Sequence, residues 1–234
     1  MQPTQDAPAE IIFKLWPWLE ANKTKLIAVA VGAVVLFGVY SFISGQKVER
    51  EAEAGRALTQ LLMTPPSGVN PSDALSALAT KYSGTQAAQR AQLQSAATLF
   101  SIGKYPEAQA EFQKFLENSP GGALAATAQL GVAACLEAQG KNDLAAVAYQ
   151  KTASTYAATP SALPALCALG RINEQAGKMN EAANNYDAAA RAGQAGGSLA
   201  QEAAMHSMEI KTKIAAQKST AAPSVITTPA TTAK

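Results

Sequence analysis

Hydrophobic and polar positions follow two different patterns along this chain. Residues 26–43, LIAVAVGAVVLFGVYSFI, form an uncharged run of 18 residues, and as a helix they cover about 27 Å, close to the hydrocarbon thickness of a bilayer. After residue 48 apolar residues are interspersed with polar ones at helical spacing. Alanine, the best helix former, dominates the apolar share. The pattern predicts an all-α protein with one transmembrane helix over residues 26–43, followed by amphipathic helices.

The apolar run has two alternative interpretations. A cleaved signal peptide has an apolar region of about 7–15 residues before a small-x-small cleavage site. This run is longer, and Ile43-Ser44-Gly45 at its end is a poor cleavage site. A buried helix of a soluble core would have polar positions on one face, and none interrupts this run. The sequence therefore favours a membrane anchor.

The segment before the run is short and carries aromatic residues. Trp16 and Trp18 lie in it, and tryptophan rings favour the headgroup zone of a bilayer. Pro17 is expected to end any helix that precedes it. Residues 1–25 are therefore expected to be a short N-terminal segment with interfacial aromatic residues, of which residues 1–10 are expected to be disordered.

Flanking charges leave the orientation of the span open. Three basic residues lie on each side of the run, and acidic residues count little in the positive-inside rule. Two of the three preceding lysines lie closest to the run, which favours a cytoplasmic N-terminus. The residues counted are Lys14, Lys23 and Lys25 before the run and Lys47, Arg50 and Arg56 after it.

The rest of the chain contains an internal repeat of 37 residues. In each copy a small residue is followed seven residues later by a glycine–lysine pair, then by an alanine, then by an aromatic residue. Such self-similarity is typical of repeat architectures. The recurring residues are Ala96, Ala133 and Gly170; Gly103, Gly140 and Gly177; Ala108, Ala145 and Ala182; and Phe112, Tyr149 and Tyr186.

Each recurring position has a role in a helix–turn–helix unit. The glycine can take the left-handed conformation that ends the first helix. The small residue and the alanine face each other across the hairpin, where bulkier groups would push the helices apart. The aromatic residue lies on the same face as the alanine and fills the space towards the next unit. The repeat therefore predicts stacked helical hairpins, that is, an α-solenoid.

The repeat domain is expected over residues 48–216. Its first unit lacks the glycine–lysine pair, has its turn at residues 63–68 and opens its second helix at Pro71. The expected segments are units at about residues 48–85, 89–122, 126–159 and 163–196, a cap helix over 198–216 and a disordered tail over 217–234. The inner stripe of the cap helix is predicted to consist of Leu199, Ala203, His206 and Ile210.

Composition excludes some classes of function. The net charge is +2, and no Lys/Arg stripe interleaves with aromatic residues, so no nucleic-acid partner is expected. Cys135 and Cys167 are too few for a disulfide framework and lack metal-ligand spacing. Both are expected to be small core residues, and a bridge between neighbouring helices stays open.

The sequence contains no motif for catalysis or cofactor binding. HExxH, GxSxG, CxxC and EF-hand spacings are absent, and no glycine–lysine pair continues with Ser or Thr as a phosphate loop would. The one histidine, His206, has no sequence partner for work as a ligand or base, and it is expected to pack in the core. We therefore expect no enzyme activity, no metal and no cofactor.

The hairpin motif resembles the tetratricopeptide (TPR) family. Residues 103–108, Gly-Lys-Tyr-Pro-Glu-Ala, are similar to its turn motif and are followed by Phe112. The second unit departs from the pattern, with Asn142 where an aromatic residue is usual. The resemblance covers residues 86–197 well and the preceding unit poorly. Because a TPR unit typically has about 34 residues, the loops between units are expected to be longer here.

The resemblance implies a protein-binding groove lined by the first helix of each unit. A mixed polar and apolar groove suits an extended peptide or a partner helix. In the alternative interpretation, the charges are a solvated face and Phe100 belongs to the core. The implied partner-binding residues are Arg90, Leu93 and Phe100, then Leu130 and Glu137, and finally Arg171 and Glu174.

The whole layout also resembles bacterial proteins in which one inner-membrane span leads into a periplasmic TPR-like domain. Those proteins associate with the Sec translocon and periplasmic chaperones. The resemblance implies a single-pass inner-membrane adaptor with a periplasmic C-terminal domain, protein partners and contact with lipid through residues 26–43. The alternative is a secreted or periplasmic TPR module, released near Gly45, that acts in envelope assembly or cell division.

Overall fold

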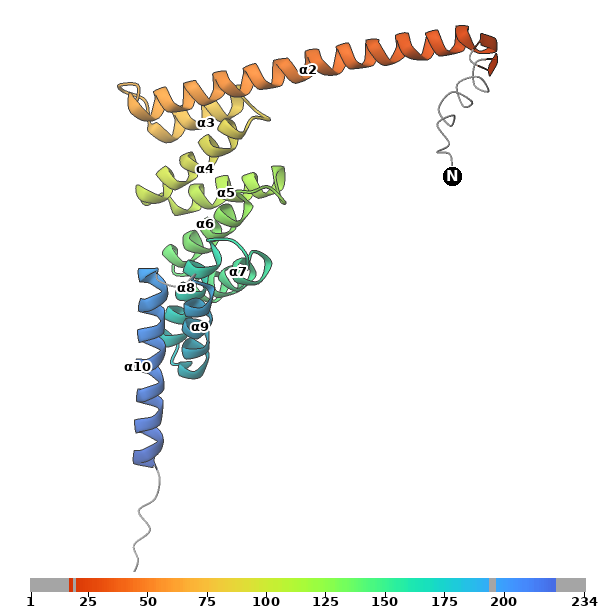
Figure 1. Cartoon of the computed structure of the whole chain (residues 1–234). Helices are drawn as coiled ribbons and strands as arrows, with labels where there is room; N and C mark the ends of the chain where they lie inside the picture. Colours follow the sequence, from red (N-terminus) through yellow and green to blue (C-terminus); the bar gives the residue numbers. More distant parts are fainter. Residues whose placement is uncertain (1–16, 19, 194–196, 222–234) are drawn as a thin grey trace, which may run out of the picture. The chain divides into compact units, whose positions relative to one another are not determined.

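A computed structural model of the chain describes residues 17–18, 20–193 and 197–221 (Figure 1). All the regular elements in these ranges are helices, which confirms the predicted all-α class. The chain divides into two compact units, Met1–Arg56 and Ala57–Lys234. Residues 1–16, expected to form most of the interfacial segment, and residues 222–234 of the expected tail lie outside the described residues.

The apolar run lies in helix α2, Lys23–Met63. The sequence placed the end of the span at residue 43 and the start of the repeat domain at residue 48, but no helix end separates them. A lone glycine such as Gly45 costs a helix only about 1 kcal/mol relative to alanine, which is too little to end it. By length and composition α2 contains the one candidate for a membrane span among the described residues, although a signal sequence would satisfy the same criteria.

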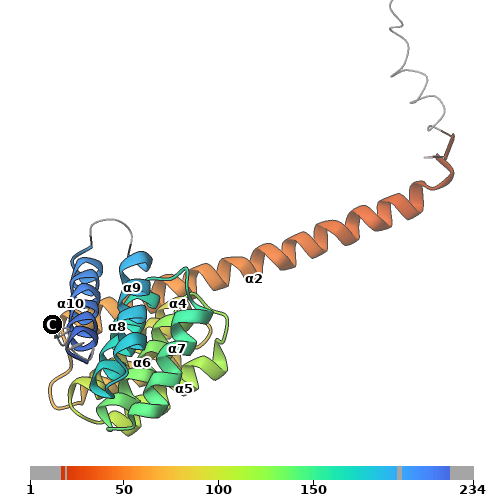
Figure 2. The same cartoon turned by 90° about the horizontal axis from the view of Figure 1, so that it is seen from below.

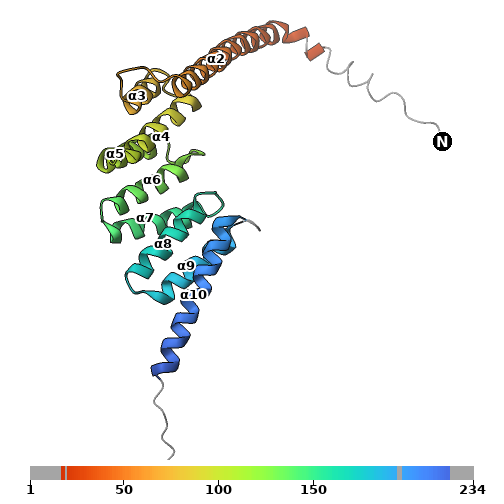
Figure 3. The ribbon, with the colours of Figure 1, turned by 90° about the vertical axis from the view of Figure 1, so that its left-hand side faces the viewer.

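The second unit is a row of consecutive helices, which Figure 3 shows from α3 to α10. Each helix from α3 onward packs against the next, and α10 also contacts α8. This arrangement confirms the predicted solenoid. The helices are α3 Pro71–Lys81, α4 Gln86–Ser101, α5 Tyr105–Asn118, α6 Ala125–Ala138, α7 Asn142–Thr155, α8 Ala162–Gln175, α9 Met179–Ala192 and α10 Ser198–Ala221.

The recurring glycines end the first helix of each hairpin. Gly103, Gly140 and Gly177 have φ angles of +78°, +74° and +73°, a conformation that costs other residues steric strain. The lysine after each glycine donates its backbone N–H to a carbonyl five residues earlier, as Lys104 does to Leu99 at 2.9 Å. Because the turn is this short, the second helix begins directly afterwards. The predicted role of glycine as a C-cap is confirmed.

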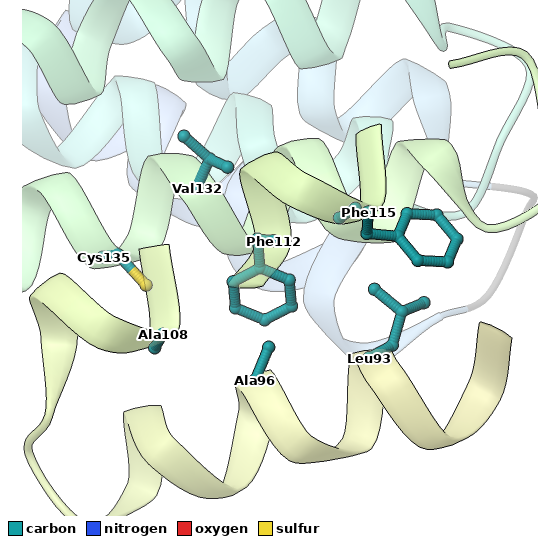
Figure 4. Close-up of a cluster of buried hydrophobic side chains, with 8 residues drawn as sticks. Leu93, Ala96, Ala108, Phe112, Phe115, Val132 and Cys135 are labelled. Atoms are coloured by element: carbon teal, nitrogen blue, oxygen red, sulfur yellow. The ribbon is translucent and has the colours of Figure 1, made fainter. Parts of the chain in front are cut away.

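The small and aromatic repeat positions form the core between the helices. Ala96 and Ala108 are fully buried and Phe112 is 6% exposed, and Figure 4 shows these side chains gathered in one cluster. A Cβ atom added at Gly131 of α6 would lie 2.6 Å from the Phe112 ring. The aromatic residue therefore packs against the next unit, as predicted.

Helix α10 buries two residues of the predicted stripe, Ala203 and Ile210, but not the other two. Leu199 is 37% exposed and the His206 side chain is 44% exposed, although both were expected to face inward. A Cβ atom at Gly193 would lie 2.2 Å from the Cβ of Ala200, so only a small side chain fits where α10 meets the end of α9. Ala200 is buried at this close approach, whereas Leu199 stays partly exposed. The buried residues of α10 include Ala200, Ala203, Ser207 and Ile210.

The far end of α10 also differs from the prediction. The helix continues to Ala221, so residues 217–221, which were expected in the disordered tail, are helical. Sequence reasoning ended the helix where its apolar periodicity faded. Alanine, glutamine and lysine, which fill positions 215–218, are good helix formers and extend it without a buried face.

Candidate protein-binding groove

The seven predicted groove residues lie on α4, α6 and α8 in different surroundings. Leu93 is 8% exposed and belongs to the core. Phe100 and Leu130 are partly buried and pack against core clusters. Arg90 is exposed on α4 and Glu174 is half-buried on α8. Leu93 therefore offers little free surface, and Arg90 offers more.

The structure brings two predicted groove residues together. Arg171 of α8 forms an ion pair through Nη1 with Oε1 of Glu137 on α6. The hydroxyl of Tyr149, from α7, donates a hydrogen bond of 2.9 Å to the other carboxylate oxygen of Glu137. Both oxygens of Glu137 thus have a donor, and three helices are joined at one point.

The protonation states of this cluster follow from its contacts. Burial is the main cause that raises the pKa of Tyr149, and the hydrogen bond to Glu137 raises it further. The hydrogen bond to Glu137 also raises the pKa of Arg171. At neutral pH Tyr149 is therefore a neutral donor and Arg171 a cation. Because the Arg171 side chain is 49% exposed, it can also reach a ligand.

Arg171 also lines a cavity of about 300 Å³ between α8, α9 and α10, three helices that lie side by side in Figure 2. One part of its wall is aromatic, because the rings of Tyr186 and His206 stack with centroids 5.2 Å apart. His206 also lies 3.9 Å from Glu202. The other lining residues are Pro164, Cys167, Ala168, Leu199 and Ala203, so most of the wall is apolar.

Both cysteines are free. Cys135 is fully buried, as predicted, whereas Cys167 is half-buried and lines the cavity. Burial raises the pKa of Cys135 to about 11, and burial and the charge of Glu202 raise the pKa of Cys167. The thiolate is the reactive form of cysteine, and burial disfavours it at both positions.

The lining of the cavity combines an apolar wall with one cationic side chain. Its wall can enclose an apolar side chain, and Arg171 can donate to a carbonyl or carboxylate beside it. In the part of the chain that the structure describes, no three His, Cys, Asp or Glu residues come together as metal ligands would.

Sequence reasoning found Arg171 but missed the other residues of the cavity. Pro164, Cys167 and Arg171 follow one another at spacings of three and four residues, so they share one helix face. Following that face back from Arg171 would have identified them. The contribution of α10 had no such signal, because it depends on which of its faces turns inward.

Comparison with known proteins identifies the fold family. The tetratricopeptide repeat-like domain family matches residues 15–214, which include the apolar run and the helical row as far as residue 214 of α10. No curated protein gives a significant match to the chain. The matched segment is most of the chain, and its helical hairpins are those that the structure describes, so this protein belongs to the tetratricopeptide repeat-like domain family.

Proposed function

We propose that this protein is a membrane-anchored adaptor that binds other proteins through the groove formed by the cavity between α8, α9 and α10, at the C-terminal end of its solenoid. The observation that carries the proposal is the cavity of about 300 Å³ between α8, α9 and α10, with the half-exposed Arg171 at its edge. A helical repeat domain with such a groove is suited to extended segments of partner proteins.

The proposed ligand segment presents an apolar side chain to the cavity. Ala168, Ala203 and the stacked rings of Tyr186 and His206 would enclose it. Arg171 would donate to a backbone carbonyl or carboxylate next to it, while Glu137 and Tyr149 hold the guanidinium in place. Burial of the apolar group supplies affinity, and the arginine fixes the orientation of the segment.

The proposed anchor is the apolar run of α2. Leu36 and Phe37 are 72% and 71% exposed, and exposed apolar surface costs free energy in water that a bilayer removes. The layout of one span before a repeat domain supports a periplasmic location, with the Sec translocon or periplasmic chaperones as partners. If the run is instead a cleaved signal, the repeat domain is a released envelope module.

Photo-cross-linking of the full-length chain in its native membrane tests the groove. A photoreactive residue replaces Leu199 at the rim of the cavity, or, as the control, the exposed Val147 of α7, which does not line the cavity. We expect cross-links to an envelope protein from position 199 that fall at least fivefold when Ala168→Phe fills the cavity. Equal cross-linking from both positions, or no effect of Ala168→Phe in a folded protein, would reject the groove.

The anchor requires a separate measurement. Protease should digest the repeat domain in spheroplasts but not in intact cells, and the mature chain should keep the mass of residues 1–234. A mature chain that begins near Gly45 would contradict the anchored adaptor and support the released module.

A further inference from the structure

A second cavity lies at the other end of the solenoid, far along the sequence from the α8–α10 groove. It occupies about 610 Å³ between α3, α4 and α5. Most of the residues that line it are polar, and it holds two charged side chains, Glu111 and Lys114. A wall of this kind does not suit an apolar ligand.

The next pair of units closes the equivalent space with large side chains. Thirty-seven residues after Ala79 and Ser119, both of which line the cavity, stand Leu116 and Tyr156. Leu116 packs against the core, and the Tyr156 hydroxyl reaches across to the carbonyl of Pro120 at 3.5 Å. The first space is therefore open because small residues replace these two.

Two other positions that line the cavity also carry different residues in the next unit. Gln89 and Glu111 stand where the next unit has Ala126 and Ala148, which are 4% and 8% exposed. Two positions that bury alanine in one unit thus carry an amide and a carboxylate in the other. Packing of the repeat does not require these polar groups.

Glu111 carries a polar atom that lacks a partner. Its Oε2 atom is buried and accepts no hydrogen bond from the residues that the structure describes, although the side chain lines the cavity. An unpaired buried acceptor is costly, above all on a carboxylate. A ligand that brings a donor to this carboxylate would remove that cost.

We propose that this cavity binds the guanidinium group of an arginine side chain of a partner protein, with Glu111 as its counter-ion. A guanidinium has five N–H donors and no acceptor, and the wall offers carboxylate, amide and hydroxyl oxygens from Glu111, Gln89, Gln92, Asn118 and Ser119. The exposed Lys114 balances the charge of Glu111. Binding therefore depends on direct contact, and its salt dependence is weak.

The probe is N-acetyl-L-arginine methylamide, titrated by NMR into the full-length chain in detergent micelles. The matched control ligand is the citrulline analogue, which has nearly the same shape without the charge. We expect the arginine probe to bind at least tenfold more tightly than the citrulline probe and to lose at least tenfold in affinity on Glu111→Gln. Glu107→Gln, at an exposed acid one turn earlier in α5, should leave the affinity unchanged.

A second variant grafts the closed arrangement of the next unit onto this one. Ala79→Leu combined with Ser119→Tyr should abolish binding while Glu111 is retained and the melting temperature does not fall. No binding of arginine, equal binding of citrulline, or binding unaffected by Glu111→Gln would each overturn the proposal. None of these results bears on cross-linking at position 199, so the two sites can fail independently.

Discussion

Residues 26–43 and helix α6 are both apolar, yet their surroundings are opposite. In the run, Leu36 and Phe37 are more than 70% exposed. In α6, Ala128, Ala133 and Cys135 are fully buried. Hydropathy alone therefore does not separate a helix that packs inside this protein from one that offers its side chains to another medium.

The difference lies in the size of the side chains and in their arrangement around the helix. Helix α6, AATAQLGVAACLEA, consists mainly of alanine and other small residues and includes the polar Gln129 and Glu137. Small residues let α5 and α7 approach closely, and Glu137 pairs with Tyr149 and Arg171. The run carries bulky apolar groups on all sides, a pattern that suits a helix surrounded by lipid or by the core of a large protein.

The largest effect should come from removing a buried aromatic ring. Phe115, 1% exposed, packs against α6 in the cluster of Figure 4, and Phe115→Ala should lower the free energy of unfolding by about 3–5 kcal/mol because of the cavity it leaves. The matched control is Phe37→Ala in the run, where the ring is 71% exposed. Urea unfolding of the repeat domain should not change in the control. Equal losses in both variants would contradict the comparison.

A charge in the run should weaken the proposed anchor. Leu36→Arg should cost membrane insertion about 2.5–3.5 kcal/mol if position 36 lies near the middle of the bilayer. Val48→Arg, on the same helix but beyond the run, should have little effect. Alkaline extraction of membranes measures both variants, and retention of Leu36→Arg at the level of the unmodified chain would count against a span.

Replacing a glycine by alanine should affect stability in α6 but not in the run. A Cβ atom at Gly131 of α6 would lie 2.6 Å from the ring of Phe112, whereas nothing lies within 4 Å of a Cβ atom at Gly32 of the run. Gly131→Ala should therefore destabilise the repeat domain by about 1–3 kcal/mol through overpacking. Gly32→Ala should leave its denaturant midpoint unchanged. A stable Gly131→Ala variant would show that the Phe112 ring can move aside.

The smallest effect on stability should come from removing one hydrogen bond to Glu137, the charged residue of α6. Tyr149→Phe removes the hydrogen bond to Glu137 and should cost about 0.5–1.5 kcal/mol at neutral pH, since Arg171 still pairs with the carboxylate.

The pH dependence of this variant has a defined sign. Because the pKa of Tyr149 is raised in the folded protein, its stabilising contribution is complete below the unfolded value of about 10 and is lost as pH rises towards the folded value. The difference between the two proteins should therefore be constant from pH 6 to about pH 9.5 and shrink above it. Tyr156→Phe, whose contact with Pro120 is longer at 3.5 Å, serves as the control. A difference that grows with pH would refute the assignment.

Much of the fold could be predicted because its causes are local. Gly103, Gly140 and Gly177 end helices through their own backbone conformation, and the small and aromatic repeat positions recur in the three hairpins that contain these glycines. The sequence could not show that the helix continues through residues 43–48, since nothing in that segment forbids either a continuous helix or a helix end. For the candidate site, Arg171 and Glu137 were found from the repeat register, but their pairing with each other and with Tyr149 was not.

The sequence by itself determined most of the helical segments of the repeat domain, where the hairpins turn and which small residues they bury, because helix propensity, glycine conformation and repeat spacing depend on near neighbours. Only the tertiary structure decided which face of α10 turns inward, which residues enclose the α8–α10 cavity and that Glu111 has a buried oxygen without a donor. These features depend on how closely helices from different units approach. A shift of one residue in packing moves every side chain to another face while the hydrophobic pattern along the chain stays the same.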